Sequence, residues 1–363
     1  SVASRGLGDV YKRQNVNNSS IPINAKNNNN ITKLTIFKKV VQETVRIDSN
    51  WDVASNAFSY QDKILYQIPN SQNNQFTAIN SESDLERILK IVGKNKYTFR
   101  KGVSAPKSHI YTLKFVEKVD ENLSKFSTYE ISAGNRLVET DNIIMLETKY
   151  IKPLIKSPHI KKLKSVWENQ YIIFPYEKQS KKPVSEDVLK SEAPRLYNYL
   201  KQNRTIIDQQ SSYNSRIQNN EEYYSLIRVG EYTYADHFAV TRDNTSIPFT
   251  HISKVLTGWG KLESPVFDGH ISFISQDEDN RFISEEEAIY ITAILNLQVV
   301  SDYILNSSSS RSIGTGFDIK LPIYDRKNAV HYKIYIIASE AIKNSLPYER
   351  IEKKIYALYN KIL

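Results

Sequence analysis

Residues 284–296 read SEEEAIYITAILN and predict the clearest helix of the chain. Ser284 and Glu287 stand at the spacing of a capping box, in which each side chain bonds the backbone of the other residue and fixes where a helix begins. Ile291 and Leu295 follow at the four-residue spacing of one helical face. Directly upstream, residues 271–275 form an apolar run that predicts a strand. The stretch therefore joins a short strand to a helix.

From Tyr150 onward, strand-like runs dominate and helices lie between them. The other strand-like runs are Tyr171–Tyr176, His237–Thr241 and His331–Ala338. Pro194 suits the first turn of a helix that continues to Leu200, because that turn leaves its backbone N–H groups unbonded and proline has none. The segment Pro347–Leu363 places four apolar side chains on one stripe and predicts a C-terminal helix with a packing face rather than a partner site: Ile351, Ile355, Leu358 and Ile362. These patterns predict an α+β fold of mixed, short-stranded sheets with interspersed helices and a C-terminal helix.

The part before Tyr150 mixes both periodicities. A helix is predicted where apolar residues recur at helical spacing: Leu34, Phe37, Val40, Val41 and Val45. A second helix is predicted over Ser81–Val92, with a serine start and Gly93 as its stop. Tyr97–Gly102 and Ile110–Val116 predict strands around a glycine turn.

The beginning of the chain does not resemble natural protein sequence. Residues 4–14 read SRGLGDVYKRQ, which resembles the translation of a transposon-type sequencing adapter, so residues 1–14 are excluded from fold reasoning. An adapter at this position predicts a carboxy-terminal fragment whose reading frame began upstream; an ordinary flexible basic tail is the alternative. Residues 15–33 are rich in asparagine and poor in apolar side chains, which predicts a linker.

Composition limits the classes of function. The 363 residues carry a net charge of +9, which suits a polyanionic partner, and they include no cysteine for a disulfide, a thiolate metal site or a nucleophile. The six histidines are scattered and fall at no metal-ligand spacing. No apolar run approaches the ~20 residues that span a bilayer. A cytoplasmic protein without a membrane partner is expected.

The positive charge is concentrated in residues 146–205, which hold 13 Lys and Arg against 6 Asp and Glu. Aromatic side chains such as Tyr150, Trp167 and Tyr176 are interleaved with these cations. Lysines in this segment could neutralise phosphates, while arginines and tyrosines could reach base edges. A solvated lysine face is the alternative interpretation, and charge alone does not decide between the two.

From Arg100 forward, the order of motifs resembles the target-recognition region of adenine-specific DNA methyltransferases with a TaqI-like carboxy-terminal specificity domain. The segments that carry the resemblance are Arg100–Gly102 with Ile110–Leu113, Tyr150–Lys156 with His159–Lys162, Tyr171–Tyr176, Pro194–Lys201, Tyr290–Asn296 and Leu321–Ile323. The chain departs from the family pattern at Asp208, where the family tends to have arginine, and at Leu297, where it has serine.

The resemblance implies a DNA-reading module of a site-specific methyltransferase of a restriction-modification system. Such an enzyme flips its target adenine into a catalytic pocket while another surface reads the neighbouring bases. The chain has neither a glycine-rich loop between a strand and a helix nor a Pro-Pro dipeptide for an N-P-P-Y site, so no catalytic residue, cofactor or metal is expected within it. Gly314–Phe317 holds a G-x-G pattern and predicts a turn. S-adenosylmethionine would bind the missing N-terminal methyltransferase domain of the same polypeptide.

The resemblance also divides the chain and nominates site residues. Residues 34–147 are expected to connect to the catalytic domain, 148–330 to recognise double-stranded DNA in a cationic, aromatic-bearing groove, and 331–363 to add a strand and a helix. The residues expected to hold phosphates are Lys161, Lys162, Lys164, Lys181 and Lys182. The candidates for base contacts are Arg195, Tyr197, Asn198, Arg204, Arg216, Tyr224 and Arg228. Phe174–Tyr176 and Ala293–Asn296 are expected to be structural.

Two other classes of function stay open at this point. A stand-alone specificity subunit of a multisubunit restriction system would bind DNA without catalysis. A nuclease would need metal-binding carboxylates, for which the candidates are Asp277–Asp279, or Asp302 with Asp318–Lys320. Acidic clusters are more often turns or solvated faces. Fusion of the parent methyltransferase to an endonuclease is compatible with the same pattern.

Overall fold

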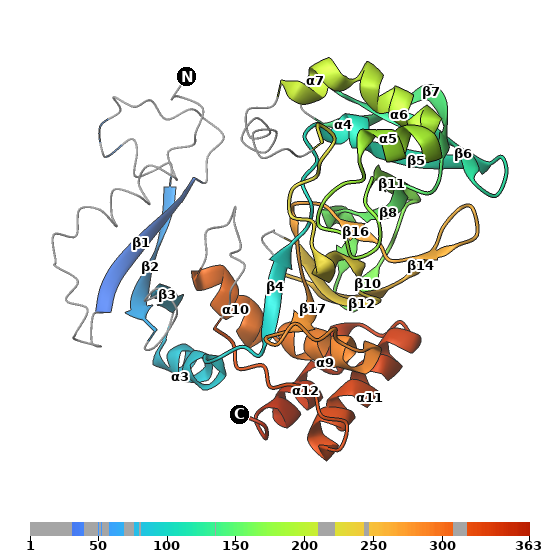
Figure 1. The fold of residues 1–363 in the computed structure, drawn as a ribbon. Helices are drawn as coiled ribbons and strands as arrows, with labels where there is room; N and C mark the ends of the chain where they lie inside the picture. Colours follow the sequence, from blue (N-terminus) through green and yellow to red (C-terminus); the bar gives the residue numbers. More distant parts are fainter. Residues whose placement is uncertain are drawn as a thin grey trace.

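The structure is a computed structural model that describes residues 31–39, 50, 52, 58–68, 76–79, 81–134, 136–209, 222–242, 247–307 and 318–363 (Figure 1). Within these ranges, helices and several small mixed sheets alternate, which confirms the predicted α+β class. The predicted adapter, residues 15–30 of the predicted linker, Arg216 and Gly314–Phe317 lie outside the described residues.

The largest sheet has six strands in the order β16-β8-β11-β5-β6-β7. Their bounds are β5 (Thr112–Lys118), β6 (Leu123–Ile131), β7 (Leu137–Glu147), β8 (Ile151–Ile155), β11 (Gln170–Ile173) and β16 (Val266–Phe267). Neighbours are antiparallel except β16, which runs parallel to β8. Four helices lie at this end of the molecule (Figure 1): α4 (Ser108–Tyr111), α5 (Glu186–Glu192), α6 (Pro194–Gln202) and α7 (Arg204–Asp208).

Aromatic side chains fill the core of the six-stranded sheet. Phe126 and Tyr171 are fully buried there, and Trp259 is only 4% exposed. The Trp259 ring lies 4.8 Å from the Tyr171 ring, centroid to centroid, and Trp167 lies 5.2 Å from the same ring. Trp259 reaches this position because the backbone N–H of Gly258 donates to the Tyr171 hydroxyl at 2.8 Å.

A second sheet has four antiparallel strands in the order β13-β12-β17-β4. Their bounds are β4 (Tyr97–Lys101), β12 (His237–Arg242), β13 (Phe249–Ser253) and β17 (Ile271–Asp277). The helices beneath it in Figure 1 are α9 (Glu285–Leu295), α10 (Gln298–Ser307), α11 (Ala329–Lys343) and α12 (Glu352–Tyr359). Short 3-10 turns lie at η1 (Ser157–His159), η2 (Glu231–Tyr234) and η3 (Tyr348–Arg350).

Smaller elements complete the described chain. A three-stranded sheet joins β1 (Ile31–Lys39), β2 (Phe58–Gln67) and β3 (Phe76–Ile79), and α3 (Glu82–Ile91) follows it. Two hairpins pair β9 (Ile160–Lys161) with β10 (Lys164–Ser165), and β14 (Val255–Leu256) with β15 (Leu262–Glu263). No single helix among the described residues is long and apolar enough to span a bilayer, although α9 and α10, which meet at a 70° bend, would pass that test as a pair.

Several helices begin where the sequence predicts them. The Ser284 hydroxyl accepts from the backbone N–H of Glu287 at 3.2 Å, and the Ser284 N–H donates to the Glu287 carboxylate at 3.4 Å, which confirms the capping box of α9. Ser81 caps α3, and Pro194 occupies the first turn of α6. Ile351, Ile355 and Leu358 are buried around α12, which confirms the predicted packing face.

Two predicted elements are wrong in type. The segment around Leu34 forms strand β1 rather than a helix, because it pairs along its length with β2; Val40–Val45 lies outside the described residues. His331–Ala338 belongs to helix α11 rather than to a strand. The Asn328 carboxamide oxygen accepts from two backbone N–H groups at the start of α11, and packing against α9 overrides the strand preference of an aromatic, β-branched sequence.

Two predicted domain boundaries do not separate units of this fold. The boundary at 147/148 falls inside the six-stranded sheet, because β5, β6 and β7 precede it while β8 and β11 follow it. The boundary at 330/331 falls inside α11. Strand β4 also joins the sheet of β17, more than 160 residues later, so the predicted connector and recognition regions are interleaved.

Candidate nucleic-acid interface

The two large sheets meet where β4 ends and β16 ends. The backbone N–H of Val103 donates to the Phe267 carbonyl at 2.8 Å. The backbone N–H of Gly102 donates to the Ile271 carbonyl at 2.9 Å. A Cβ at position 102 would stand 2.0 Å from the Asp268 carbonyl oxygen, so this close approach requires glycine. The junction therefore places the turn after β16, residues 268–270, directly against the end of β4.

Arg228 lies beside this junction. Its Nη1 donates to the Gly102 carbonyl at 3.3 Å, and its own carbonyl accepts from the Tyr232 hydroxyl at 3.0 Å. The Arg228 backbone has φ of 65°, the left-handed region that a side chain with a Cβ adopts at some energetic cost. Arg228 is exposed and makes no ion pair with any described residue.

Arg242 approaches the same turn from the end of β12. Its Nη1 lies 3.5 Å from the Ser157 carbonyl oxygen, and the Ser157 hydroxyl donates to the His270 carbonyl at 3.4 Å. The Nε of Arg242 is buried and has no hydrogen-bond partner among the described residues. Arg242 therefore keeps donor capacity that the described protein groups do not satisfy.

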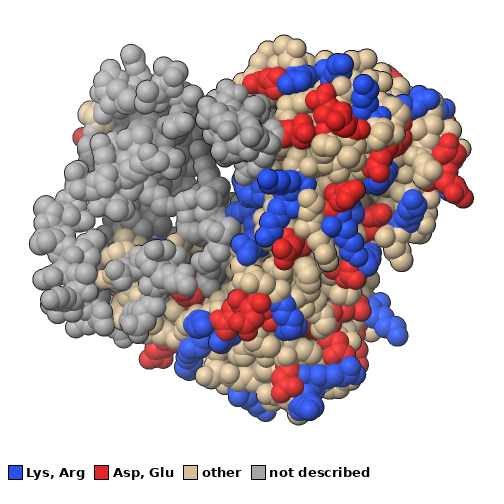
Figure 2. Space-filling model, in the orientation of Figure 1, with Lys and Arg blue, Asp and Glu red and all other residues tan. Residues whose placement is uncertain are grey.

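Arg100, on β4, shares a neighbour with Arg228. Its guanidinium carbon lies 4.8 Å above the centre of the Tyr232 ring, and its Nε is also buried without a described partner. We call the cations at this junction the cationic band: Arg100, Lys101, Lys156, Arg228 and Arg242. Figure 2 shows Lys and Arg side chains gathered beside the end of β4, next to the residues drawn in grey.

Three titratable side chains in or next to the band are partly buried: Lys156, His159 and Asp268. Burial lowers the pKa of Lys156 and of His159, whose Nδ1 accepts from the Lys156 backbone N–H at 3.1 Å. Burial raises the pKa of Asp268, and the backbone N–H of His270 donates to its carboxylate at 2.9 Å. The Asp268 carboxylate interacts electrostatically with Lys156, but Asp268 is only partly exposed, whereas Arg228 and His270 are exposed.

Three of the predicted phosphate contacts adjoin the band. Lys161, Lys162 and Lys164 lie on the β9–β10 hairpin, which the Leu163 N–H joins to the Phe249 carbonyl at 3.0 Å. Phe249 pairs with the last residues of β12, next to Arg242. Lys161 and Lys164 are exposed, whereas Lys162 lies 3.5 Å from the Glu349 carboxylate.

Two further predicted lysines lie on the opposite side of Arg228. Lys181 pairs with Glu231 of η2 at 3.3 Å, and the Tyr234 hydroxyl donates to the Ser180 carbonyl at 2.7 Å. These contacts hold the 180–182 turn against η2, which begins three residues after Arg228. The hairpin, the junction and this turn therefore form one series of contacting segments.

The remaining predicted base contacts lie elsewhere. Arg195, Asn198 and Arg204 are exposed on α6 and α7, where Arg204 pairs with Asp208 at 3.5 Å. Tyr197 is 6% exposed and donates to Glu186, and Tyr224 is fully buried and donates to the Val184 carbonyl. Both tyrosines are core residues in this structure, so we leave them out of the interface. Phe174 and Tyr176 are also buried, as the prediction of a structural role requires.

A separate hollow within the predicted recognition region combines aromatic and cationic side chains. A cavity of about 540 Å³ is lined by Tyr150, Phe174, Tyr176 and Tyr234 together with Lys149, Lys152, Lys178 and Lys254. Three of these lysines are ion-paired: Lys149 with Glu192, Lys152 with Glu263 and Lys254 with Asp236. None of the five predicted phosphate contacts lines it. Most of the positive charge around this cavity is therefore neutralised by neighbouring carboxylates, which, among the described residues, is not the case in the cationic band.

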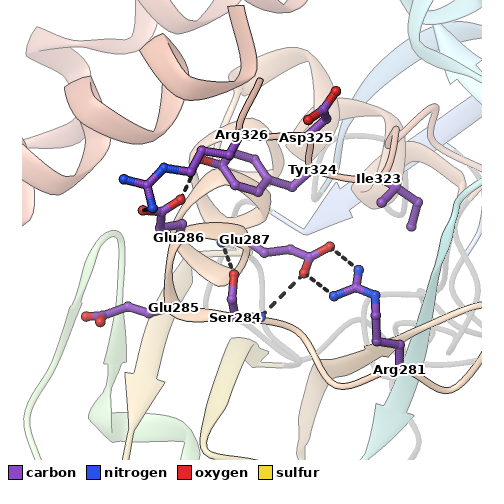
Figure 3. A pocket seen from close by; sticks show the side chains of 9 residues that line it. All are labelled: Arg281, Ser284, Glu285, Glu286, Glu287, Ile323, Tyr324, Asp325 and Arg326. Atoms are coloured by element: carbon purple, nitrogen blue, oxygen red, sulfur yellow. Dashed lines mark hydrogen bonds and ion pairs between the residues drawn. The ribbon is translucent and has the colours of Figure 1, made fainter. Parts of the chain in front are cut away.

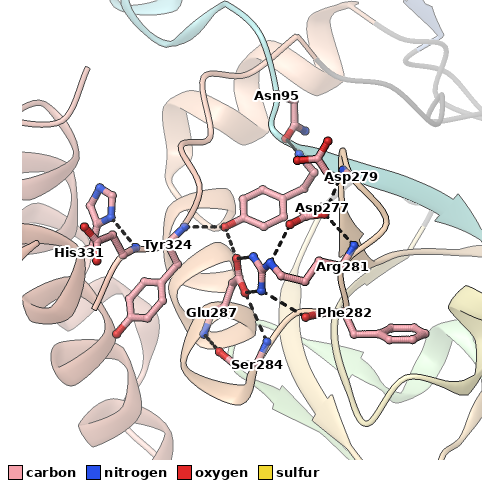
Figure 4. A network of polar contacts seen from close by, with 11 residues as sticks. Asn95, Asp277, Asp279, Arg281, Phe282, Ser284, Glu287, Tyr324 and His331 are labelled. Carbon is pink, nitrogen blue, oxygen red and sulfur yellow. Dashed lines mark hydrogen bonds and ion pairs between the residues drawn. The ribbon is translucent and has the colours of Figure 1, made fainter. Parts of the chain in front are cut away.

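A second hollow, of about 600 Å³, lies at the start of α9 (Figure 3). Behind it, the Glu287 carboxylate accepts from both Nη atoms of Arg281 at 2.8 and 2.9 Å and from the Tyr97 hydroxyl at 2.8 Å (Figure 4). Two of the acidic residues considered for a nuclease are engaged in ion pairs here, since Asp277 pairs with Arg281 and Glu278 pairs with Lys94 and Lys96. Within the described residues, no group of three or more side chains is placed to hold a metal ion.

Sequence reasoning missed most of the band. Arg100, Lys101, Lys156 and Arg242 are distributed over more than 140 residues, and only the paired strands bring them together. The one local signal is Gly102 directly after two cations at a strand end. Comparison with known proteins adds nothing to this, because no protein-family model matches the chain and a search of curated proteins finds no significant relative.

Proposed function

We propose that this chain is the sequence-specific DNA-recognition module of a site-specific adenine DNA methyltransferase, and that it contacts double-stranded DNA through the cationic band and the neighbouring lysines. The parent class rests on the order of motifs that resembles the TaqI-like specificity domains. In that class, S-adenosylmethionine is bound by a separate methyltransferase domain of the same polypeptide. The mode of binding rests on the geometry of the junction.

The observation that carries the proposal is the clustering of arginines with unused donors. Arg228 is exposed without a described ion pair, and the Nε atoms of Arg100 and Arg242 are buried without described partners. A buried donor without an acceptor is unfavourable, and phosphate oxygens are strong acceptors for guanidinium groups. Lys161 and Lys164 extend the same positive surface along the hairpin. A polyanion would therefore pair with the exposed cations Arg228, Lys161 and Lys164, to which no described carboxylate is ion-paired.

The test is duplex DNA binding at increasing salt, measured by fluorescence anisotropy. Neutralising Arg228, Arg242, Lys161 and Lys164 together, each to Gln, removes three cations proposed to hold phosphates together with the exposed Arg228. The slope of log Kd against log salt is expected to fall by roughly 1 for each phosphate that the protein no longer neutralises. The matched control neutralises four exposed cations elsewhere: Lys118, Arg136, Lys333 and Lys354. Equal salt slopes for the two quadruple variants would contradict the proposal.

A further inference from the structure

Arg228 differs from the other cations of the band because its backbone is fixed on both sides. Ile227 exchanges two backbone hydrogen bonds with Ser104, at 2.9 and 3.1 Å, and the Gly230 N–H donates to the Thr233 hydroxyl at 3.3 Å. The Tyr232 hydroxyl donates a hydrogen bond to the carbonyl of Arg228 itself. The left-handed φ of Arg228 is thus maintained by contacts before and after it. Strained backbone of this kind clusters at ligand-binding sites, which motivates a functional interpretation of Arg228.

The guanidinium of Arg228 is also partly oriented. One of its five N–H donors bonds the Gly102 carbonyl, which ties the side chain to the junction where no Cβ fits. The residue as a whole is exposed, so a ligand can approach it. The side chains of Lys161 and Lys164 are less oriented, because lysine presents a rotating point charge on a flexible stem. Arg228 is therefore the cation whose geometry is best prepared for a directional contact.

We infer that Arg228 is a specificity-determining residue that reads one guanine in the major groove, while Arg242, Lys161 and Lys164 hold phosphates. The inference rests on the proposed function. A planar guanidinium pairs with the O6 and N7 acceptors of guanine through two parallel hydrogen bonds, and this pattern of acceptors occurs on no other base. Phosphate contacts, in contrast, fix position and carry no sequence information. A guanidinium that is already oriented by the protein is suited to pairing with a guanine.

The experiment uses the full chain and duplex DNA with a randomised central segment. Sequences bound by the wild type and by the Arg228→Lys variant are selected and compared. Lysine keeps the positive charge but lacks the planar pair of donors of a guanidinium. We therefore expect the preference of the protein for guanine at one position to fall by about tenfold, while the slope of log Kd against log salt stays unchanged. Replacing that guanine by 7-deazaguanine should weaken wild-type binding by about tenfold and leave Arg228→Lys unaffected. Arg136→Lys, on the β6–β7 hairpin, is the matched control.

The outcomes separate the two proposals. Selection of one site by both proteins, with the same preference at every position, overturns the role of Arg228 and leaves the proposed function standing. Failure of the wild type to bind any duplex overturns the proposed function itself. The Arg228→Gly variant guards against misfolding, because glycine accepts the left-handed φ. It should retain the wild-type unfolding transition and lose the guanine preference, and retention of that preference would equally overturn the inference.

Discussion

The backbone of Gly102 lies so close to Asp268 that a Cβ at position 102 would stand 2.0 Å from the Asp268 carbonyl oxygen. The same glycine offers its carbonyl to Arg228. One residue type at one position therefore keeps the two large sheets in contact and positions a cation of the proposed DNA surface.

Gly102→Ala is expected to destabilise the protein, because the added methyl group meets backbone atoms that cannot move aside. Overpacking of this kind costs about 1–3 kcal/mol or more. Urea unfolding followed by circular dichroism measures the change. Gly134→Ala is the control, since no atom lies within 4 Å of a Cβ built there. A Gly102→Ala protein as stable as the control would mean that the junction is looser than the structure describes.

Asn296→Ala is expected to loosen the contact between α9 and strand β13. The Asn296 carboxamide donates to the Phe249 carbonyl at 2.7 Å and accepts from the Phe249 N–H at 2.9 Å, and all of these groups are buried. Removing it leaves a donor and an acceptor unsatisfied, which costs about 2–4 kcal/mol in total. Thermal unfolding of Asn296→Ala beside the exposed Asn198→Ala tests this, and equal midpoints would contradict it.

Arg281→Met is expected to destabilise the start of α9. Glu287 is 2% exposed, and the variant leaves its carboxylate with the Tyr97 hydroxyl and the Ser284 backbone alone. Because the Arg281 side chain is 51% exposed, the cost is expected to fall below the ~3–5 kcal/mol of breaking a fully buried ion pair. Tyr97→Phe, which removes one neutral donor, should cost less. If denaturant titrations of the two variants gave the reverse order, Arg281 would not be the main partner of Glu287.

Stability should depend on pH through His251. Burial, with a smaller contribution from His237, lowers the pKa of His251 to about 4, whereas an unfolded histidine titrates near 6.5. Between these values the unfolded chain takes up a proton that the folded chain does not. Stability is therefore expected to fall as pH decreases from about 6.5 to about 4, by about 3 kcal/mol at most. His251→Gln should flatten this part of the unfolding profile; an unchanged profile would exclude His251 as its source.

The elements that sequence reasoning found correctly carry their signals locally. Ser284 and Glu287 cap α9 with atoms three residues apart, and Ser81 does the same for α3. The sequence of α11 predicts a strand because its isoleucines and tyrosines suit either structure, and contact with α9 decides between them. Strand β1 likewise depends on pairing with β2, which no pattern within the segment itself reveals.

The candidate site was less predictable than the fold. Lys161, Lys164 and Arg228 were found because they lie in or near a basic segment, but charge density did not distinguish them from Lys162 and Lys181, which are paired with glutamates. Tyr224 was nominated for its chemistry and is buried instead. Arg242 contacts Ser157 across 85 residues of sequence, and such a distance leaves no local signal.

The aromatic cluster around Tyr171 contains two of the three tryptophans of the chain, so most of the tryptophan fluorescence comes from one part of the protein. Trp167 and Trp259 both contact that ring, so in a Trp51→Phe variant their fluorescence would report on the six-stranded sheet alone. Emission would then record the six-stranded sheet, whereas far-ultraviolet dichroism records the secondary structure of the whole molecule, so a separation of the two unfolding curves would reveal that the rest of the protein melts independently of this sheet.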